Sequence, residues 1–412
     1  MTRVLPLFVV AALPLAAIAV MGQSTGDPLP RATAAAARLE PTALEQSTAV
    51  LRRFVDEGRV AGAVAMLARN GTVAYSSAVG YQDLQTRAPM TERSLFRIYS
   101  MTKTVTAVAV LMLLEERRFG LDDPVAKYLP EFADVTVLQP DGSTRRPAKA
   151  PTIRDLLLHT SGMSHRTADV YRDAKVRSRS IDLPQFVRNV VRVPLMEEPG
   201  TRYRYSESTT VLGRLVEVWS GQSFEAFLQA RVLTPLRMPD TTFVVRPDQR
   251  ARLATVYGPA DGGLRAVELE DPPFTERPAL IEGAVGLVSS AGDFLRFGQM
   301  LLNGGELDGV RLLKAETMRS AVANGLSAEV LASKRNGVTG WGLANVDVVM
   351  KPEGVRYPAA AGEYGWDGTA GTIFWNDPRA NTVIVLMTQS SPADPGGLRQ
   401  QFKSAIQAAV LP

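Results

Sequence analysis

The chain has 412 residues, of which 45% are hydrophobic and 21% are charged, a composition typical of soluble globular proteins that is long enough for two domains. It contains no cysteine, which excludes a disulfide framework, thiolate catalysis and a zinc–thiolate site. The net charge is only +4 and the basic residues are dispersed, so we expect no nucleic-acid partner. Its two histidines, His159 and His165, are too few for a site of three imidazoles, and we expect no metal.

The first residues have the order of an export signal. Arg3 precedes an apolar run that ends near Met21, and small residues follow. This order predicts a signal peptide over residues 1–22 and export to the periplasm or the medium. The alternative is an uncleaved membrane anchor, although the apolar run is borderline in length for a span. Residues 23–40, rich in Ala, Pro, Thr and Ser, are predicted to form a mobile spacer.

Apolar periodicity predicts the elements that follow. An amphipathic helix begins at Pro41, two β-type runs are joined by the hairpin signature Asn70-Gly71, and a long apolar helix spans about Met101–Arg118. The middle of the chain is predicted to be helical and rich in loops. Helices are expected in the stretches PTIRDLLLHTSG, TTVLGRLVEVWSG, FEAFLQARVL and AGDFLRFGQMLLN.

Strand-type runs return after about Gly337. They are GWGLANVDVVM, GTIFWNDP and NTVIVLMTQ, and the helical stretch GGLRQQFKSAIQAAVL follows them. Strands therefore occur at both ends of the chain and helices in the middle. This predicts an α+β fold in which both ends form one antiparallel sheet, flanked by the terminal helices. Residues 41–119 and 285–412 would form the α/β part, and residues 120–284 an inserted, mostly helical domain.

Two serine motifs compete for the role of nucleophile. The stretch GQSTG, residues 22–26, matches the G-x-S-x-G elbow, but it lacks the strand before it and the helix after it that this motif requires. The second is Ser100-Met-Thr-Lys103, directly before an apolar helix. On a helix, residues three apart share a face, so the hydroxyl and the amine can meet. Burial in the apolar helix would lower the pKa of Lys103, and the positive end of the helix dipole would favour negative charge at Ser100.

Taken alone, this motif has a plain alternative, an N-cap serine followed by an exposed lysine. A serine nucleophile also needs a base. Tyr205, in the stretch GTRYRYSESTTVLGRLVE, precedes a helix of the middle region and could face Ser100 across a cleft between the two parts.

Several stretches together resemble the penicillin-recognising serine hydrolases, and within these the class C β-lactamase-like group. They follow one another in the order of that family: YSMTK with FGLDDPVAKYLPEF, PTIRDLLLHTSGM, RYSESTTVLGRLVEVWSGQSFEAFL, GAVGLVSSAGDFLRFGQMLLNGG and YGWDGTAGTIFWNDPRANTVIVLMTQ. The resemblance covers about residues 45–410 and is far more specific than any single motif. It implies a β-lactamase-like fold and an enzyme that needs no cofactor.

The resemblance also implies a role for each matched residue. Ser100 takes the place of the acylated nucleophile, Lys103 that of its proton-relay partner, and Tyr205 that of the general base that later protonates the leaving group. The segment Trp366–Gly368 takes the place of the strand motif that borders the cleft. The oxyanion hole of the family would consist here of the backbone N–H groups of Ser100 and Thr369.

Two departures from the family favour esters over β-lactams. Trp366 stands where β-lactamases and most D,D-peptidases carry Lys or His, and a tryptophan cannot pair with a substrate carboxylate. Glu207 stands where the family has an asparagine that binds an amide, and an ionised carboxylate cannot donate a hydrogen bond. The W-x-G pattern resembles the carboxylesterase and acyltransferase branch, which includes the esterases called family VIII. We therefore expect a small-molecule ester substrate, bound beside Trp366, Gly368 and Glu207.

Other functions remain open at this stage. The same Ser-Lys-Tyr set could serve a β-lactamase or D,D-peptidase, an acyltransferase, or a sensor that is acylated by penicillin without turnover. His159 is expected to be structural because the family uses tyrosine as its base, and His165 has no motif support. The oligomeric state is not predicted.

The stretch YGWDGTAG, residues 364–371, supports two interpretations. Local rules predict a hairpin turn at Asp367-Gly368. The resemblance instead predicts a strand that lines the cleft, in which Gly368 lets backbone approach the substrate. Neither interpretation assigns a role to Asp367.

Overall fold

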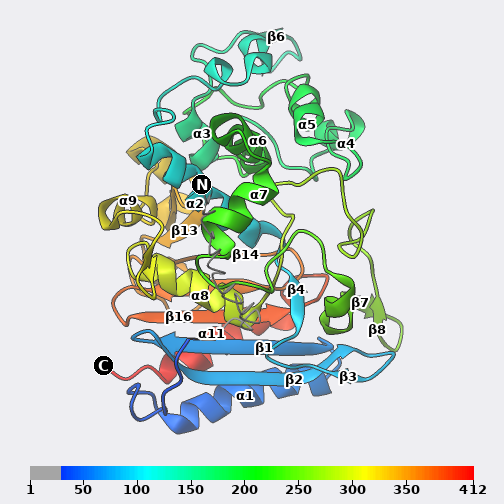
Figure 1. Ribbon diagram of the computed structural model, residues 1–412, viewed down its shortest axis with the longest axis vertical. Coiled ribbons are helices and arrows are strands. Elements are labelled where there is room, and N and C mark those ends of the chain that lie inside the picture. Colours follow the sequence, from blue (N-terminus) through cyan, green and yellow to red (C-terminus); the bar gives the residue numbers. More distant parts are fainter. Residues whose placement is uncertain (1–28) are drawn as a thin grey trace, which may run out of the picture.

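The computed structural model describes residues 29–412 and is built on an eight-stranded antiparallel sheet (Figure 1). The predicted signal peptide and the GQSTG stretch lie outside the described residues. The strands follow the order β12-β13-β14-β15-β16-β1-β2-β3 across the sheet. They are β1 (Gly62–Arg69), β2 (Thr72–Asp83), β3 (Ala88–Pro89), β12 (Thr339–Gly342), β13 (Val346–Val349), β14 (Tyr364–Asp367), β15 (Ile373–Asp377) and β16 (Thr382–Thr388).

The centre of the sheet joins the two ends of the chain. Strand β1 pairs with β16 in a register that runs from Ala63 opposite Thr388 to Arg69 opposite Thr382. All eight residues of β1 are buried, because helices cover both faces of the sheet. The predicted antiparallel sheet built from both ends of the chain, with flanking helices, is therefore confirmed.

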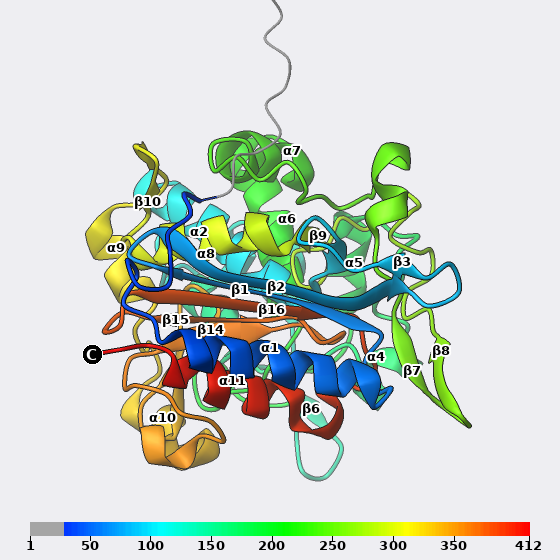
Figure 2. The same ribbon diagram turned by 90° about the horizontal axis from the view of Figure 1, so that it is seen from below.

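Alternate side chains of β1 serve two separate cores. Ala63, Ala65 and Leu67 pack towards α1 (Pro41–Asp56) and α11 (Leu398–Ala408), which lie side by side on one face (Figure 2). The intervening residues Val64, Met66 and Ala68 pack on the other face, which α8 (Ala291–Leu302) covers. Because side chains alternate along a strand, a strand covered on both faces is apolar along nearly its whole length, and in β1 only the terminal Arg69 is charged.

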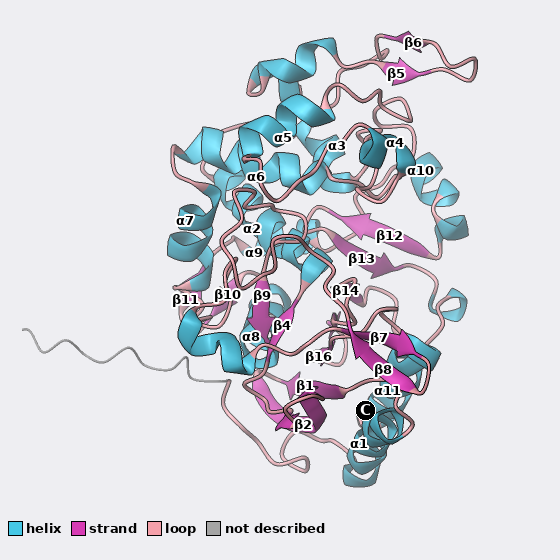
Figure 3. Cartoon of the chain, turned by 90° about the vertical axis from the view of Figure 1, so that its right-hand side faces the viewer, coloured by secondary structure: helices cyan, strands magenta, loops and turns pink. Residues whose placement is uncertain are grey.

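The remaining helices gather beyond the α8 face and at the far end of the molecule (Figures 1 and 3). Helix α2 packs against α6, and α6 in turn contacts α3, α5 and α7. These helices are α2 (Thr102–Glu115), α3 (Ile153–Leu158), α4 (Asp169–Asp173), α5 (Leu183–Val190), α6 (Ser208–Ser220), α7 (Phe224–Leu228), α9 (Ala315–Ala321) and α10 (Ala328–Ser333). The domain boundaries at residues 119 and 285 stay a prediction.

The middle of the chain also contains strands that periodicity does not predict. Two short hairpins turn at Asp-Gly pairs, Asp141-Gly142 and Asp261-Gly262, the same signal that marks hairpins elsewhere. A third two-stranded pair joins the two segments of the predicted α/β part and leads into the Ser100 turn. The pairs are β5 (Val137–Leu138) with β6 (Thr144–Arg145), β7 (Tyr257–Ala260) with β8 (Gly263–Ala266), β4 (Leu95–Arg97) with β9 (Val288–Ser290), and β10 (Glu306–Leu307) with β11 (Val310–Arg311).

The prediction of a mobile spacer is wrong for residues 29–40. Leu29, Ala37 and Leu39 are buried against the rest of the protein. The guanidinium of Arg69, at the end of β1, donates hydrogen bonds to the carbonyl oxygen atoms of Arg38 at 2.7 Å and Leu411 at 2.8 Å. A composition rich in small residues hides this packing, because only three apolar side chains and several backbone groups carry it.

One predicted strand is divided in the structure, and one predicted helix is shorter than expected. The stretch GWGLANVDVVM forms two strands, β12 and β13, because Asn345 adopts a left-handed conformation (φ 55°) and turns the chain between them. The helix in PTIRDLLLHTSG ends at Leu158, since His159 is also left-handed (φ 55°). Residues of this conformation interrupt regular structure although the surrounding apolar pattern continues. In residues 29–412, no helix has the length and apolar character needed to cross a membrane.

A buried ion pair beneath the sheet offers a test of this packing. Lys403 Nζ lies 3.0 Å from Glu363 Oε2, and both side chains are almost wholly inaccessible. Lys403→Met leaves the carboxylate buried without its cation, so we expect a loss of about 3–5 kcal/mol in the free energy of unfolding, measured by urea denaturation. The double variant Lys403→Met/Glu363→Leu should recover most of this loss. A single variant as stable as the parent would contradict the expectation.

Candidate active site

Ser100 lies in a tight turn between β4 and α2. Residues Tyr99–Met101 form one 3₁₀ turn, and α2 begins directly after it at Thr102. Tyr99 is fully buried and has φ 41°, a conformation that costs a non-glycine residue of order 1–3 kcal/mol and that recurs at functional sites. Every residue of α2 from Thr102 to Leu113 is buried. The turn therefore presents Ser100, 7% exposed, at the N-terminal end of a helix enclosed by apolar side chains.

Lys103 is held inside this apolar environment. Its side chain is 0% exposed, and Nζ donates a hydrogen bond of 3.0 Å to the carbonyl oxygen of Ala284. Nζ also lies 3.4 Å from Ser100 Oγ, so the predicted meeting of hydroxyl and amine is present. Burial lowers the pKa of Lys103 to about 8, while the charge of Glu207 acts in the opposite direction. The amine can thus exchange a proton near neutral pH.

Tyr205 completes the predicted group of three. It precedes α6, and its hydroxyl hydrogen-bonds with Ser100 and accepts a hydrogen bond of 3.1 Å from Trp366 Nε1. Lys103 Nζ lies 4.7 Å from the centre of the Tyr205 ring. Burial raises the pKa of Tyr205 above its ordinary value, and the two hydrogen bonds lower it in part. The structure therefore brings Ser100 and Lys103, which lie on one turn and helix, together with Tyr205 from a separate segment.

Four aromatic rings enclose the ring of Tyr205. Their centres lie 4.8 Å (His159), 5.2 Å (Trp366), 5.5 Å (His165) and 6.0 Å (Trp341) from its centre. Burial lowers the pKa of both histidines, that of His165 to about 4, so both are neutral at pH 7. His159 Nδ1 contacts Ser206 Oγ at 3.1 Å and so supports the loop that carries Tyr205. The packing of His165 on Tyr205 had no signal in the sequence.

The turn after β14 meets the segment that carries Ser100. A Cβ atom at Gly368 would lie 2.5 Å from the carbonyl oxygen of Ile98 and still closer to the hydroxyl of Thr372, so no side chain fits there. Gly371 N–H donates to Gly368 O at 3.1 Å, and Gly368 N–H donates to Thr372 O at 2.8 Å. Both interpretations of YGWDGTAG are therefore correct in part, since β14 ends at Asp367 and a tight turn follows. Thr369 is exposed in this turn.

Asp367 anchors the same turn to the C-terminal helix. Its carboxylate forms an ion pair with Arg399 of α11. The guanidinium also donates to the carbonyl oxygen atoms of Gly368 at 3.1 Å and Thr372 at 3.3 Å. One arginine thus holds both ends of the turn. The sequence alone could not reveal this pair, because the two residues lie 32 positions apart on elements of different type.

Glu207 lies beside these groups in the interior and is wholly buried. Its Oε2 accepts a hydrogen bond of 3.1 Å from Thr210, while Oε1 has no hydrogen-bond partner among residues 29–412. Burial raises the pKa of Glu207, but the positive charges around it, that of Lys103 first, outweigh burial and hold the pKa below its ordinary value. The carboxylate is therefore ionised. Because Glu207 is wholly buried, it does not have the exposed position that the predicted contact with substrate would require.

A cavity of about 1100 Å³ opens beside Tyr205 and Trp366. Aromatic residues line it on the side of the site, among them Tyr203, Trp366 and Phe374. Charged residues of both signs also line it, including Lys334, Asp347 and Asp367. Tyr205 and Trp366 are among the lining residues, whereas Ser100 is not.

Comparison with known proteins agrees with this arrangement. A family model described as Beta-lactamase matches residues 48–407. The chain is 32% identical over 367 residues to Protein Rv1367c of Mycobacterium tuberculosis, covering 85% of this chain and 90% of that protein. It is 31% identical over 390 residues to Esterase EstB of Burkholderia gladioli, covering 86% and 95%.

Among solved structures, the fold is similar to that of EstCE1, described as a hydrolase with promiscuous acyltransferase activity. The TM-score is 0.79 with 26% identity, and the match covers 89% of this chain and 98% of that one. The predicted relationship to β-lactamase-like serine hydrolases with esterase relatives is therefore confirmed.

The close approach at Gly368 can be tested by one methyl group. Gly368→Ala must displace the turn that carries Thr369 from the Ser100 segment, and a shift of about 1 Å can reduce activity roughly 10²-fold. We expect this loss in kcat/KM for p-nitrophenyl butyrate, with circular dichroism unchanged. Gly292→Ala on α8 is the matched control, because a Cβ there meets no atom within 4 Å. Full activity of Gly368→Ala would contradict the contact.

Proposed function

The chain belongs to the Beta-lactamase family, and on this basis we propose that it is an exported carboxylesterase that acts through an acyl-enzyme on Ser100. The observation that carries the proposal is the hydrogen bond of 3.1 Å from Trp366 Nε1 to the Tyr205 hydroxyl. The indole occupies the place of the Lys or His that would engage a substrate carboxylate, and its only N–H is engaged by Tyr205. Export is inferred from residues 1–22 alone.

The first half of the reaction transfers an acyl group to Ser100. Tyr205, beside Lys103, takes the Ser100 proton as Oγ attacks the carbonyl carbon of the ester. The backbone N–H groups of Ser100 and Thr369 would stabilise the oxyanion; loss of one such donor typically costs about 10²–10³-fold in rate. The C–O bond of the ester then breaks, and Tyr205 returns the proton to the leaving alcohol. Water attacks the acyl-enzyme in the second half and releases the acid.

Burial determines how many protons Lys103 and Tyr205 hold together, which we call the proton inventory of the mechanism. Because burial raises the pKa of Tyr205, the tyrosine considered alone is a neutral phenol at rest. Its protonation must therefore be considered together with that of Lys103. The ammonium of Lys103 with a phenolate, and the neutral amine with a phenol, contain the same number of protons. Lys103 Nζ lies 4.7 Å from the centre of the Tyr205 ring, and we infer that the two groups titrate as a coupled pair. The active form is the one in which the pair has lost one proton.

An acyltransferase is the second candidate, because a solved structure similar to this one is described as a hydrolase with promiscuous acyltransferase activity. An alcohol or amine would then replace water in the second half of the reaction. The cavity beside Tyr205 and Trp366 is large enough for such an acceptor. A β-lactamase, a D,D-peptidase or a penicillin sensor would need to engage a carboxylate at the position that Trp366 occupies.

A substrate panel tests the proposal directly. We expect the purified protein to hydrolyse short p-nitrophenyl esters, to turn over a chromogenic cephalosporin at least about 10²-fold more slowly, and to lose ester hydrolysis in Ser100→Ala. Activity retained in Ser100→Ala would refute the nucleophile, and rapid cephalosporin turnover would refute the interpretation of Trp366. Product analysis with an added alcohol separates hydrolase from acyltransferase.

The buried lysine predicts the pH dependence. The pKa of Lys103 lies at about 8, lowered by burial, and activity requires its pair with Tyr205 to lose a proton. We therefore expect kcat/KM for p-nitrophenyl butyrate to rise with pH, with a midpoint near pH 8. Rates measured with Ser100→Ala give the spontaneous hydrolysis to subtract. A profile that is flat from pH 6 to pH 9 would count against this proton inventory.

A further inference from the structure

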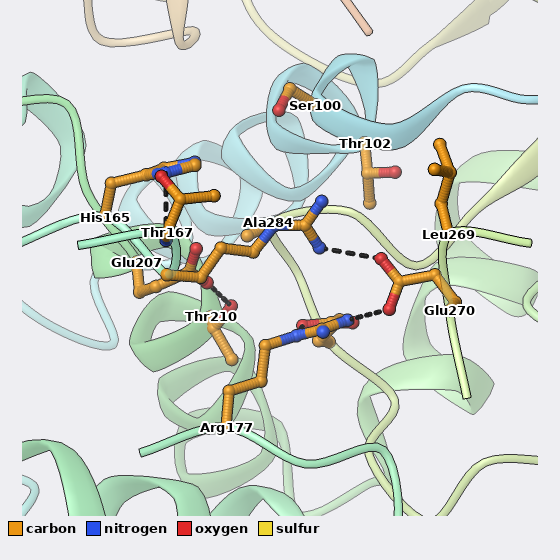
Figure 4. Close-up of polar contacts among 12 residues, drawn as sticks. Ser100, Thr102, His165, Thr167, Arg177, Glu207, Thr210, Leu269, Glu270 and Ala284 are labelled. Carbon is orange, nitrogen blue, oxygen red and sulfur yellow. Dashed lines mark hydrogen bonds and ion pairs between the residues drawn. The ribbon is translucent and has the colours of Figure 1, made fainter. Parts of the chain in front are cut away.

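A network of two buried glutamates and two partly buried arginines lies beside the segment whose Ala284 carbonyl group binds Lys103. Arg166 lies 2.9 Å from Glu270, and Arg177 lies 2.8 Å from Glu270 and 2.8 Å from Glu282. Figure 4 shows Glu270 between two guanidinium groups, while Glu207 lies apart from them and bonds to Thr210. Arg177 therefore fixes Glu282, two residues before the carbonyl group of Ala284 that accepts the hydrogen bond from Lys103.

Three buried charged groups near this network lie outside its ion pairs, in which two arginines pair with two glutamates. The first is Arg179, whose guanidinium lies 4.3 Å from the centre of the Phe274 ring; as a cation it supplies no anion to Lys103. Lys103 forms no ion pair in the described part of the chain, and its amine contacts only neutral oxygens, those of Ala284 and Ser100, through hydrogen bonds. Oε1 of Glu207 is likewise without a hydrogen-bond partner among residues 29–412. Both side chains are 0% exposed, so water does not screen one from the other.

Glu207 has reasons to be ionised at this depth. It is the N-cap residue of α6, where the helix dipole favours negative charge. Thr210 donates a hydrogen bond to it. Lys103 lies near it, because Nζ is 4.7 Å from the ring centre of Tyr205, two residues before Glu207, and α2 packs against α6. Lys103 is accordingly the first of the positive charges that lower the pKa of Glu207. A buried carboxylate without such charges would be protonated instead.

We propose that Glu207 is the buried counter-charge of Lys103, a positioning residue whose negative charge sets the pH at which the catalytic pair becomes active. The proposal rests on the proposed function only where it concerns activity. It replaces the expectation that Glu207 contacts substrate, because the carboxylate is enclosed and acts through the lysine.

The other charged groups around Lys103 do not supply this charge. Arg166 and Glu282 belong to the network, in which each is already paired. Asp367 is engaged by Arg399 on the far side of β14. His165 has its pKa lowered to about 4 by burial and is neutral at pH 7, as is His159. Tyr205 is the partner of Lys103 in the titrating pair. Removal of the charge at Glu207 therefore leaves Lys103 without an unpaired anion beside it.

The experiment measures the titration of Lys103 itself. The chain has eight lysines, so ¹³C-labelled lysine gives few signals, and Lys103→Arg identifies the one that belongs to Lys103. Glu207→Gln removes the charge and keeps the shape. We expect the Lys103 midpoint to move to lower pH by roughly one unit or more, because a nearby opposite charge stabilises the ammonium. The rising limb of the kcat/KM profile should move in the same direction by the same amount.

Two further variants keep the test decisive. Glu207→Asp retains the charge and should keep the midpoint near that of the parent, whereas Glu207→Asn, which differs from it only in charge, should shift it as Gln does. This pair decides the matter if Glu207→Gln fails to fold. Glu363→Gln removes another buried carboxylate beside a lysine, Lys403, and should leave the Lys103 midpoint unchanged.

The outcomes separate the two proposals. An unchanged Lys103 midpoint in Glu207→Gln, or equal midpoints in the Asp and Asn variants, would overturn the counter-charge. A changed KM for esters with an unmoved midpoint would restore the role in substrate contact and also overturn it. If the midpoint moves while Ser100→Ala keeps its activity, the counter-charge stands and the proposed reaction fails.

Discussion

The enclosure of one lysine amine in an apolar helix is the constraint on which the site depends. Because all of α2 near Lys103 is buried, the amine must find its partners among neighbouring segments rather than in water. It contacts the hydroxyl of Ser100 on its own turn, and the carbonyl group of Ala284 and the ring of Tyr205 from two other parts of the chain. The charge network at Arg177 and Glu282 fixes the carbonyl group of Ala284. The site is therefore an arrangement for keeping an ionisable group dry and still in contact with the reacting hydroxyl.

The sheet forms the side of the site opposite Lys103, through close contacts between the end of β14 and the Ser100 turn. Strand β14 can approach the Ser100 turn only because Gly368 has no side chain. Arg399 then holds the turn from the other face of the sheet through Asp367. The active-site turn is thus connected to α11, which packs with α1 beneath the sheet. Tyr205 and Trp366 pack against the core on the α8 side of the sheet, whereas α11 belongs to the core on the other side.

Much of this architecture follows from patterns that are local in the sequence. Period-two apolar runs at both ends predicted the sheet, and the spacing of Ser100 and Lys103 predicted their contact, because both depend on neighbours along one element. The Asp-Gly hairpins of the middle region were not predicted, although the Asp-Gly signal is present, because the region was interpreted as helical. Residues 29–40 were misjudged because packing by three apolar side chains does not alter a composition.

The contacts that could not be predicted are those between segments distant in the sequence. The pair of Asp367 with Arg399, the packing of His165 on Tyr205 and the enclosure of Glu207 each join separate elements. Their residue types are common and their spacing follows no period. Only the path of the chain in three dimensions decides which charged groups lie close enough to interact.

The indole of Trp366 has a consequence of a different kind. It is one of four tryptophans in the chain, it donates its N–H to Tyr205, and it meets Trp341 edge-on with ring centres 4.5 Å apart. Indole fluorescence depends on the bond at its nitrogen, and a neighbouring tyrosinate quenches it. Trp366 is therefore also an intrinsic optical probe in contact with Tyr205, and it needs no added label.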